Sequence, residues 1–278
     1  MEQRQYRIEL GHKAATRLSQ FLQTLSLDAW RYPSACDGWE VGDVVAHLAW
    51  VAEVYIDMIK QGRRGDLTPW ENFPDPHTID LTAYHQFVAQ TATAYHQRHG
   101  DHLIATFTDG YDTLHHLFLS LGPDDWDKPC FHPFGFFPVR MFVDLRISEL
   151  AMHEWDIRSP LDPDFHLWAE SIPLFMERAA ALRGFYPGAP LSTPIRYRFA
   201  LTGPSASTHD IIVEGERARM ETAGNGHAAV TFHCDTETFI LLMYGRVTHE
   251  AALTSGCLMG EGNYQLIKTF GQYFGRHR

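Results

Sequence analysis

The chain has 278 residues, 45% of them hydrophobic and 21% charged, so it can form one large domain or two ordinary ones with real cores. Its formal net charge of −11 gives no electrostatic support for a nucleic acid or an anionic membrane as partner. The N-terminal residues lack the apolar segment of a signal peptide, and the longest apolar run, Phe239 to Tyr244, is too short for a membrane span. The four cysteines form no CxxC pair, which is typical of reduced thiols. These features predict a cytoplasmic protein.

Apolar residues recur at three- and four-residue spacing through the first two thirds of the chain, which predicts amphipathic helices. The first such series begins near Ala14. A loop rich in Pro, Gly and Asp is expected over 62–76. The other predicted helices cover 41–59, 81–121 with an interruption near Asp109 and Gly110, 138–157, and 164–182.

The pattern changes after Pro187-Gly188-Ala189-Pro190, where apolar and polar residues begin to alternate as they do in strands. The predicted strands are 195–201, 209–214 and 229–234, followed by helices over 236–244 and 263–274. Strands followed by helices indicate a separate, smaller α+β domain. We therefore expect a helical domain over 1–187 and an α+β domain over 188–278.

Glu149 and His153 lie four residues apart in the predicted helix 138–157, so their side chains project from one face. A carboxylate and an imidazole on one face can bind a divalent metal if a third ligand arrives from elsewhere, and His47 is the candidate. The alternative is a structural network in which Arg146 pairs with Glu149 and His153 with Asp156. In the metal interpretation Asp156 orients the His153 ring instead. Spacing alone leaves both interpretations open.

Three segments resemble known families. Residues 39–48, Trp-Glu-Val-Gly-Asp-Val-Val-Ala-His-Leu, resemble the GW-x-V-x-D-x-x-A-H-L segment of the DinB-like superfamily. Residues 146–157, with Arg146, Glu149, His153 and Trp155-Asp156-Ile157, resemble the second signature of the mycothiol-dependent maleylpyruvate isomerase family. Residues 241–247, Leu-Leu-Met-Tyr-Gly-Arg-Val, resemble the L-x-x-x-x-G-R segment of its C-terminal domain. In order and in spacing, the resemblance covers essentially the whole chain.

The resemblance implies a DinB-like four-helix bundle followed by a sterol-carrier-like α+β domain. It implies that His47, Glu149 and His153 bind a divalent metal, usually zinc, although Ni²⁺ or another divalent ion also suits these ligands. It also implies a low-molecular-weight thiol such as mycothiol as cosubstrate, and a thiol-dependent isomerase acting on a small electrophile. Arg246 is then the candidate catalytic residue that binds a substrate carboxylate from the C-terminal domain. Pairing of Arg246 with an acid is the structural alternative.

Several alternatives stay open at this point. The chain could be a thiol S-transferase with an unrelated substrate, or a non-catalytic, metal-containing protein that binds small molecules; a monomer and a small homo-oligomer both fit. Glu40 departs from the Ser or Thr usual at the start of the ligand helix, so another residue such as Asp37 is expected to cap it. The aromatic segment 131–137 could line the pocket or fill the core, and His132 within it could act as an acid, a base or an extra ligand.

Overall fold

The computed structural model describes residues 2–70, 73, 81–181, 185 and 191–274. The chain divides into two compact units, Met1–Phe165 and His166–Arg278. Among the described residues, no helix combines the length and the hydropathy that a membrane span requires. The expected domain boundary between 187 and 188 lies outside the described residues.

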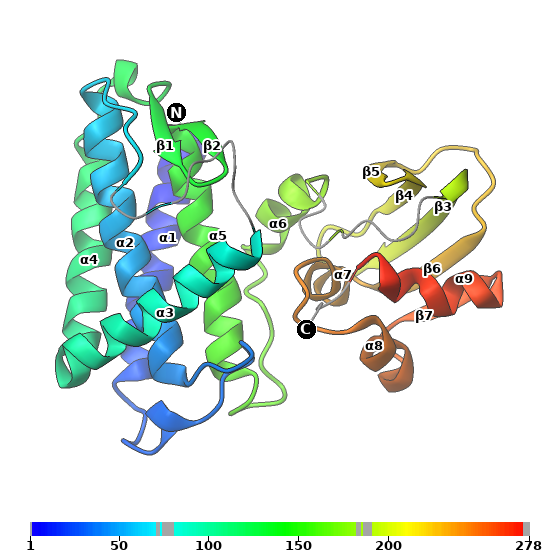
Figure 1. Ribbon diagram of the computed structural model, residues 1–278, viewed down its shortest axis with the longest axis horizontal. Helices are drawn as coiled ribbons and strands as arrows, with labels where there is room; N and C mark the ends of the chain where they lie inside the picture. The colour runs from blue at the N-terminus through cyan, green and yellow to red at the C-terminus, as the bar shows by residue number, and fades with distance from the viewer. Residues whose placement is uncertain (1, 71–72, 74–80, 182–184, 186–190, 275–278) are drawn as a thin grey trace. The chain divides into compact units, whose positions relative to one another are not determined.

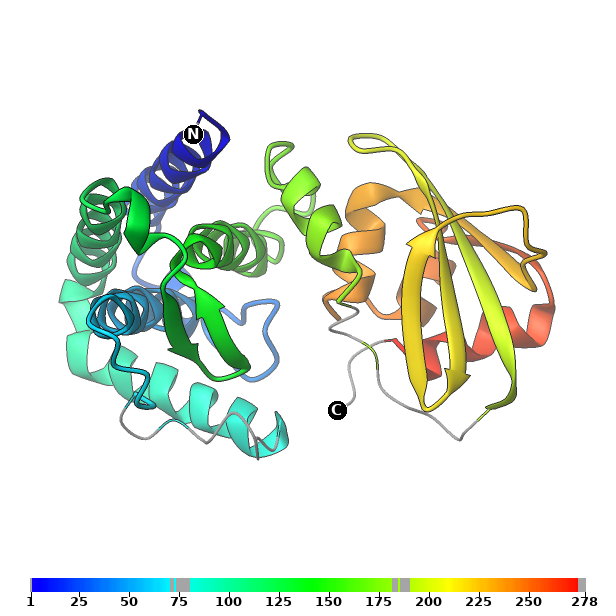
Figure 2. The same ribbon diagram turned by 90° about the horizontal axis from the view of Figure 1, so that it is seen from above.

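The first unit is helical. Helices α1, α2, α4 and α5 lie side by side as a four-helix bundle (Figure 1), and Figure 2 looks nearly along their axes. Helix α3 packs on α2. Fully buried apolar side chains from each bundle helix, among them Leu18, Val44, Phe107 and Phe142, form the core. The helices are α1 (Glu2–Leu22), α2 (Val41–Arg63), α3 (Leu81–His99), α4 (Leu103–Leu119) and α5 (Val139–Arg158).

Two features of this unit differ from the sequence-based expectation. The break in the helical region 81–121 lies at Gly100, whose φ of 46° ends α3, and not at Asp109 and Gly110. Gly110 is inside α4, where a Cβ atom would lie 3.4 Å from the Cβ of Ala52 on α2. The aromatic segment 131–137, for which the sequence predicted no strands, lies in a hairpin of β1 (Pro129–His132) and β2 (Gly135–Pro138). Pro138 ends this hairpin and directly precedes α5.

The second unit combines a short helix, α6 (Ile172–Ala179), with a five-stranded sheet and three further helices. The strand order is β5-β4-β3-β6-β7, in which β3 and β6 are parallel and the other neighbours antiparallel. Tyr197 and Phe199 on β3 pack with Phe232 and Phe270 in the core of this unit. The elements are β3 (Leu191–Thr202), β4 (Thr208–Gly215), β5 (Arg217–Thr222), β6 (Val230–Asp235), α7 (Thr236–Met243), α8 (His249–Ser255), β7 (Met259–Gly262) and α9 (Tyr264–Thr269).

The sequence pattern did not predict β5, β7 and α8, which are six, four and seven residues long. It also predicted too long a helix over 164–182, because α6 begins only at Ile172. Helix α6 belongs by its contacts to the second unit and packs on α7. Phe175 on α6 meets the ring of Tyr244 edge-on, with a centroid distance of 5.2 Å.

Candidate metal centre

Helix α2 carries His47 on a buried face, and its first turn is fixed by an acidic side chain. Oδ2 of Asp43 accepts a hydrogen bond from the backbone N–H of Glu40 at 3.1 Å. This bond is half of a reciprocal capping box between Glu40 and Asp43, so Glu40 takes part in the cap although it departs from the usual Ser or Thr. The expected contribution of Asp37 stays a prediction. His47 is 8% exposed, and its ring lies against Trp39 at a centroid distance of 5.4 Å. The residues that begin α2 therefore also fix the position of the His47 ring on that helix.

Helix α5 brings Glu149 and His153 to the same point. Oε2 of Glu149 lies 3.5 Å from Nε2 of His47 and 3.3 Å from Nε2 of His153. One ligand atom from each of the three side chains lies within 4.8 Å of the other two. The Glu149 side chain is 26% exposed, whereas the two histidine side chains are 10% and 11% exposed. Of the three side chains, that of Glu149 is the most exposed, and the two histidines are almost completely buried.

The spacing of these atoms suits a metal ion. Ligands about 2.0–2.1 Å from a tetrahedral zinc ion stand about 3.3–3.4 Å apart, close to the two distances from Glu149. Two imidazole nitrogens and a carboxylate oxygen form a donor set that zinc and other divalent ions accept. Three protein ligands also leave one position for an exogenous molecule. The residues present fit a divalent metal with an open coordination site.

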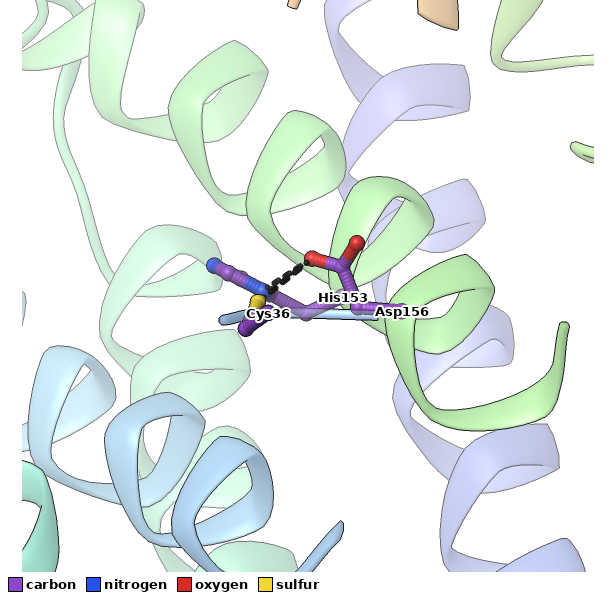
Figure 3. A group of neighbouring side chains, drawn as sticks. All are labelled: Cys36, His153 and Asp156. Carbon is purple, nitrogen blue, oxygen red and sulfur yellow. Dashed lines mark hydrogen bonds and ion pairs between the residues drawn. The ribbon is translucent and has the colours of Figure 1, made fainter. Parts of the chain in front are cut away.

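Asp156 controls the second nitrogen of His153. Oδ2 of Asp156 lies 2.9 Å from Nδ1 of His153 (Figure 3), and the Asp156 side chain is fully buried. A carboxylate at Nδ1 favours the tautomer in which that nitrogen carries the proton, and this directs the Nε2 lone pair toward Glu149. The contact between His153 and Asp156 is therefore compatible with both interpretations, a metal site and a structural network.

The protonation of the pair follows from these contacts. Burial raises the pKa of Glu149, but hydrogen bonds from His153 and His47 outweigh it and hold that pKa well below its ordinary value. Burial likewise lowers the pKa of His153, but the side chains of Asp156, Cys36 and Glu149 outweigh it and hold that pKa well above its ordinary value. Without a metal, an imidazolium therefore faces a carboxylate here.

Arg146 does not pair with Glu149, although the structural-network alternative required that pair. Its Nη2 donates to the carbonyl of Ile8 on α1 at 2.6 Å, and its guanidinium lies 5.0 Å from the Phe118 ring centroid. The side chain is 1% exposed, and burial lowers its pKa to about 10. A Cβ atom on Gly11 would collide with this guanidinium. Arg146 therefore joins α1 to α5 and does not contact Glu149 in any described interaction.

Arg246 and His132 are the other two candidate residues. Arg246 belongs to the second unit, where its backbone N–H donates to the carbonyl of Leu241 and its Nη1 to that of Tyr244. Its role stays a prediction. His132 is buried in the β1–β2 hairpin; its Nδ1 accepts from the backbone N–H of Phe134 at 3.2 Å, and its ring stacks on Phe137. It is not among the potential metal ligands found in the described residues.

Cys36 is a neighbour of the site that the motif spacing did not reveal. Its Sγ lies 3.1 Å from Oδ2 of Asp156, and Cys36, His153 and Asp156 form a second group with ligand-type atoms close together. Figure 3 shows the three side chains converging. The sequence offered one faint signal, namely that Cys36 lies just before the segment that resembles the DinB-like superfamily.

The sequence profile of the mycothiol maleylpyruvate isomerase N-terminal domain matches residues 12–158, more than half of the chain, and includes all three residues of the cluster. The chain belongs to this family. No curated protein sequence matches the chain. The family assignment agrees with the resemblance seen in the sequence motifs.

One solved structure shares the fold over most of this chain, and two others resemble parts of it. A crystal structure of the mycothiol-dependent maleylpyruvate isomerase is 15% identical, covers 93% of this chain and 92% of its own, and superposes with a TM-score of 0.61. YfiT from Bacillus subtilis, described as a probable metal-dependent hydrolase with an unusual four-helix bundle topology, is 18% identical over 56% of this chain and 85% of its own, with a TM-score of 0.40. Sterol Carrier Protein-2 like-3 from Aedes aegypti is 12% identical over 36% of this chain and 92% of its own, with a TM-score of 0.27. The predicted fold class, a helical bundle followed by a smaller α+β domain, is confirmed.

Proposed function

We propose that this protein is a divalent-metal-dependent enzyme that uses a low-molecular-weight thiol to isomerise a small electrophilic substrate. The observation that carries the proposal is the approach of His47, Glu149 and His153 at ligand distances. Membership of the maleylpyruvate isomerase family supports the choice of reaction. We further propose Zn²⁺ as the metal, because imidazole and carboxylate ligands at tetrahedral spacing suit it.

Each residue of the cluster has a defined task in this proposal. His47, Glu149 and His153 would hold the metal, and Asp156 would keep the His153 ring in the tautomer that offers Nε2. A divalent cation held there would stabilise the thiolate of a bound thiol at neutral pH. Three protein ligands would leave one coordination position of the metal for that thiol. The side chains of both histidines are only 10% and 11% exposed, so little water reaches their rings.

The reaction itself needs a nucleophile that leaves again. Sulfur adds to one carbon of a cis double bond that is conjugated to a carbonyl, and the electron pair moves onto that carbonyl as an enolate. Rotation about the new single bond follows. Return of the electron pair then expels the thiolate and leaves the trans product. The thiol is regenerated, so it acts as a cosubstrate without net consumption.

We propose that Arg246 binds a carboxylate of such a substrate, because the guanidinium of an arginine binds carboxylates through paired hydrogen bonds. The matching substitution is Arg246→Lys, which keeps the charge and loses the paired geometry. It should raise KM for a diacid more than it lowers kcat. An unchanged KM would remove Arg246 from the binding site and leave the metal cluster unaffected.

The central test measures metal content and turnover together. Purified wild type, His47→Ala and the control His116→Ala, an exposed histidine on α4, are loaded with Zn²⁺ and dialysed. We expect about one metal per chain in wild type and in the control, and little in His47→Ala. Wild type without stoichiometric metal would contradict the proposal.

Turnover is then followed with mycothiol and maleylpyruvate, and the free thiol is measured beside the product. An isomerase converts substrate while the thiol concentration stays constant. If one thiol is consumed for each substrate molecule converted, the protein is a thiol S-transferase instead. Binding of the substrate with neither product nor thiol loss would assign a small-molecule binding protein.

A further inference from the structure

The thiol of Cys36 contacts the carboxylate that orients His153. Oδ2 of Asp156 lies 3.1 Å from Sγ of Cys36 and 2.9 Å from Nδ1 of His153, so one oxygen accepts from both side chains (Figure 3). Asp156 is fully buried, whereas Cys36 is half-buried at the edge of the cluster. A buried carboxylate is stable only when donors replace the water it has lost, and the thiol supplies one of these donors.

The backbone around Cys36 holds its thiol in this position. The backbone N–H of Ala35 donates to the carbonyl of Asp156 at 2.8 Å, so main chain and side chain both attach this loop to α5. The N–H of Trp39 donates to the carbonyl of Cys36 at 3.1 Å, and Gly38 has a φ of 75°, which closes a tight turn. The loop 34–39 therefore has little freedom to move the thiol away from Asp156.

The same loop contacts both histidines of the cluster. Trp39 packs on the ring of His47, while Cys36 lies beside His153 and shares Oδ2 of Asp156 with it. Two donors on one carboxylate oxygen restrict rotation of the carboxylate about its χ2 angle more than one donor does. A fixed carboxylate in turn fixes the plane of the imidazole, and so the direction of Nε2.

We propose that Cys36 is a positioning residue of the metal centre, acting on His153 through its hydrogen bond to Asp156. The inference rests on the proposed function, since His153 needs orienting only if it binds a metal. The thiol itself is not a ligand in this scheme: it donates its proton to Asp156, away from the Nε2 side of the ring. Its contribution is to the affinity and the geometry of the metal site.

The test compares three substitutions of the thiol. Cys36→Ala and Cys36→Val remove the donor, the first with a smaller and the second with a slightly larger apolar side chain, whereas Cys36→Ser keeps an O–H donor. The affinity for Zn²⁺ is measured by competition with a chromophoric chelator, and the visible spectrum is recorded with Co²⁺ in place of Zn²⁺. We expect Ala and Val to weaken metal binding about tenfold and to change the Co²⁺ spectrum. Ser should restore the affinity to within about threefold of wild type.

Cys257→Ala, which removes an exposed thiol in the second unit, is the matched control and should bind metal as wild type does.

If wild type binds metal and the Ala and Val variants bind it equally well with the same Co²⁺ spectrum, the inference is wrong while the proposed function stands. If wild type binds no metal, the proposed function itself has failed. A sulfur-to-Co²⁺ charge-transfer band that disappears in Cys36→Ser would make Cys36 a ligand and overturn the positioning role. Loss of affinity in Val with recovery in Ser supports the inference even if the Ala variant does not fold.

Discussion

Nδ1 of His153 lies 2.9 Å from the buried carboxylate of Asp156, three residues further along α5. Because the two residues lie on one helix, their contact depends only on local geometry. It determines which ring nitrogen faces Glu149, and therefore whether the cluster can act as a metal site. The first prediction follows from this contact.

Asp156→Asn should weaken Zn²⁺ binding by about 10–100-fold, because an amide accepts a hydrogen bond from Nδ1 less strongly and can present its own N–H instead. Chelator competition measures the change. Glu154→Gln is the control on the same helix, since Glu154 is equally buried but pairs with Arg17 and Arg158. The control is expected to lose stability and keep its metal affinity. Equal losses of affinity in both variants would point to general damage to α5.

Gly11→Ala should destabilise the first unit by about 1–3 kcal/mol, because the added methyl group collides with the guanidinium of Arg146. Urea unfolding of the purified protein measures the loss. The matched substitution is Gly110→Ala in α4, whose added methyl group meets only ordinary contacts with Ala52. Since alanine favours helix by up to about 1 kcal/mol over glycine, this control should be neutral or stabilising. If Gly11→Ala is as stable as wild type, close packing of Arg146 against position 11 does not contribute to stability.

Asp210→Ala should destabilise the second unit strongly. Asp210 is fully buried on β4 and pairs with Arg196 at 2.6 Å and Arg198 at 2.8 Å, so its removal leaves two guanidinium groups without their shared carboxylate. Both arginines are about a quarter exposed and Arg196 keeps Glu221 at 2.9 Å, so the loss should exceed that of an exposed pair and stay below that of a fully buried one. The exposed pair of Arg219 and Glu214 offers the comparison, and Glu214→Gln should change the free energy of unfolding by less than about 1 kcal/mol. Thermal unfolding distinguishes the two, and a small effect of Asp210→Ala would contradict the assignment.

The second unit should also lose stability in mild acid. His249 is 4% exposed and its Nε2 lies 2.6 Å from the carbonyl of Ile267; burial lowers its pKa below the ordinary value of 6.5. Below pH 6.5 the His249 ring is therefore protonated in the unfolded chain but still neutral in the folded chain. The stabilisation that the neutral His249 ring gives the folded state is fully present above pH 6.5. It is lost as the pH falls toward the pKa of the folded state, and the free energy of unfolding then drops by at most about 1.4 kcal/mol per pH unit.

Unfolding free energies measured between pH 7.5 and 5 check this dependence. His249→Gln has no titrating ring, so its stability should fall less steeply over the same range, although it starts lower. Parallel curves for the two proteins would show that another group dominates the acid response.

The sequence by itself determined the features that depend on neighbouring residues. Helical periodicity placed Glu149 and His153 on one face, because 3.6 residues per turn brings positions four apart together in any α-helix. It also placed Asp156 within reach of His153. The change from helical spacing to strand alternation predicted two domain types in the right order, and family motifs identified His47 as the third candidate ligand.

Only the tertiary structure decided the contacts between distant segments. Nothing in the spacing showed that His47 on α2 would meet Glu149 on α5, or that Arg146 would turn toward Ile8 and leave Glu149 to the histidines. Cys36 and Asp156 are 120 positions apart, and their hydrogen bond forms because the turn at Gly38 folds the loop onto α5. Such contacts arise from the packing of the whole bundle, in which every helix constrains its neighbours, and no local pattern encodes them.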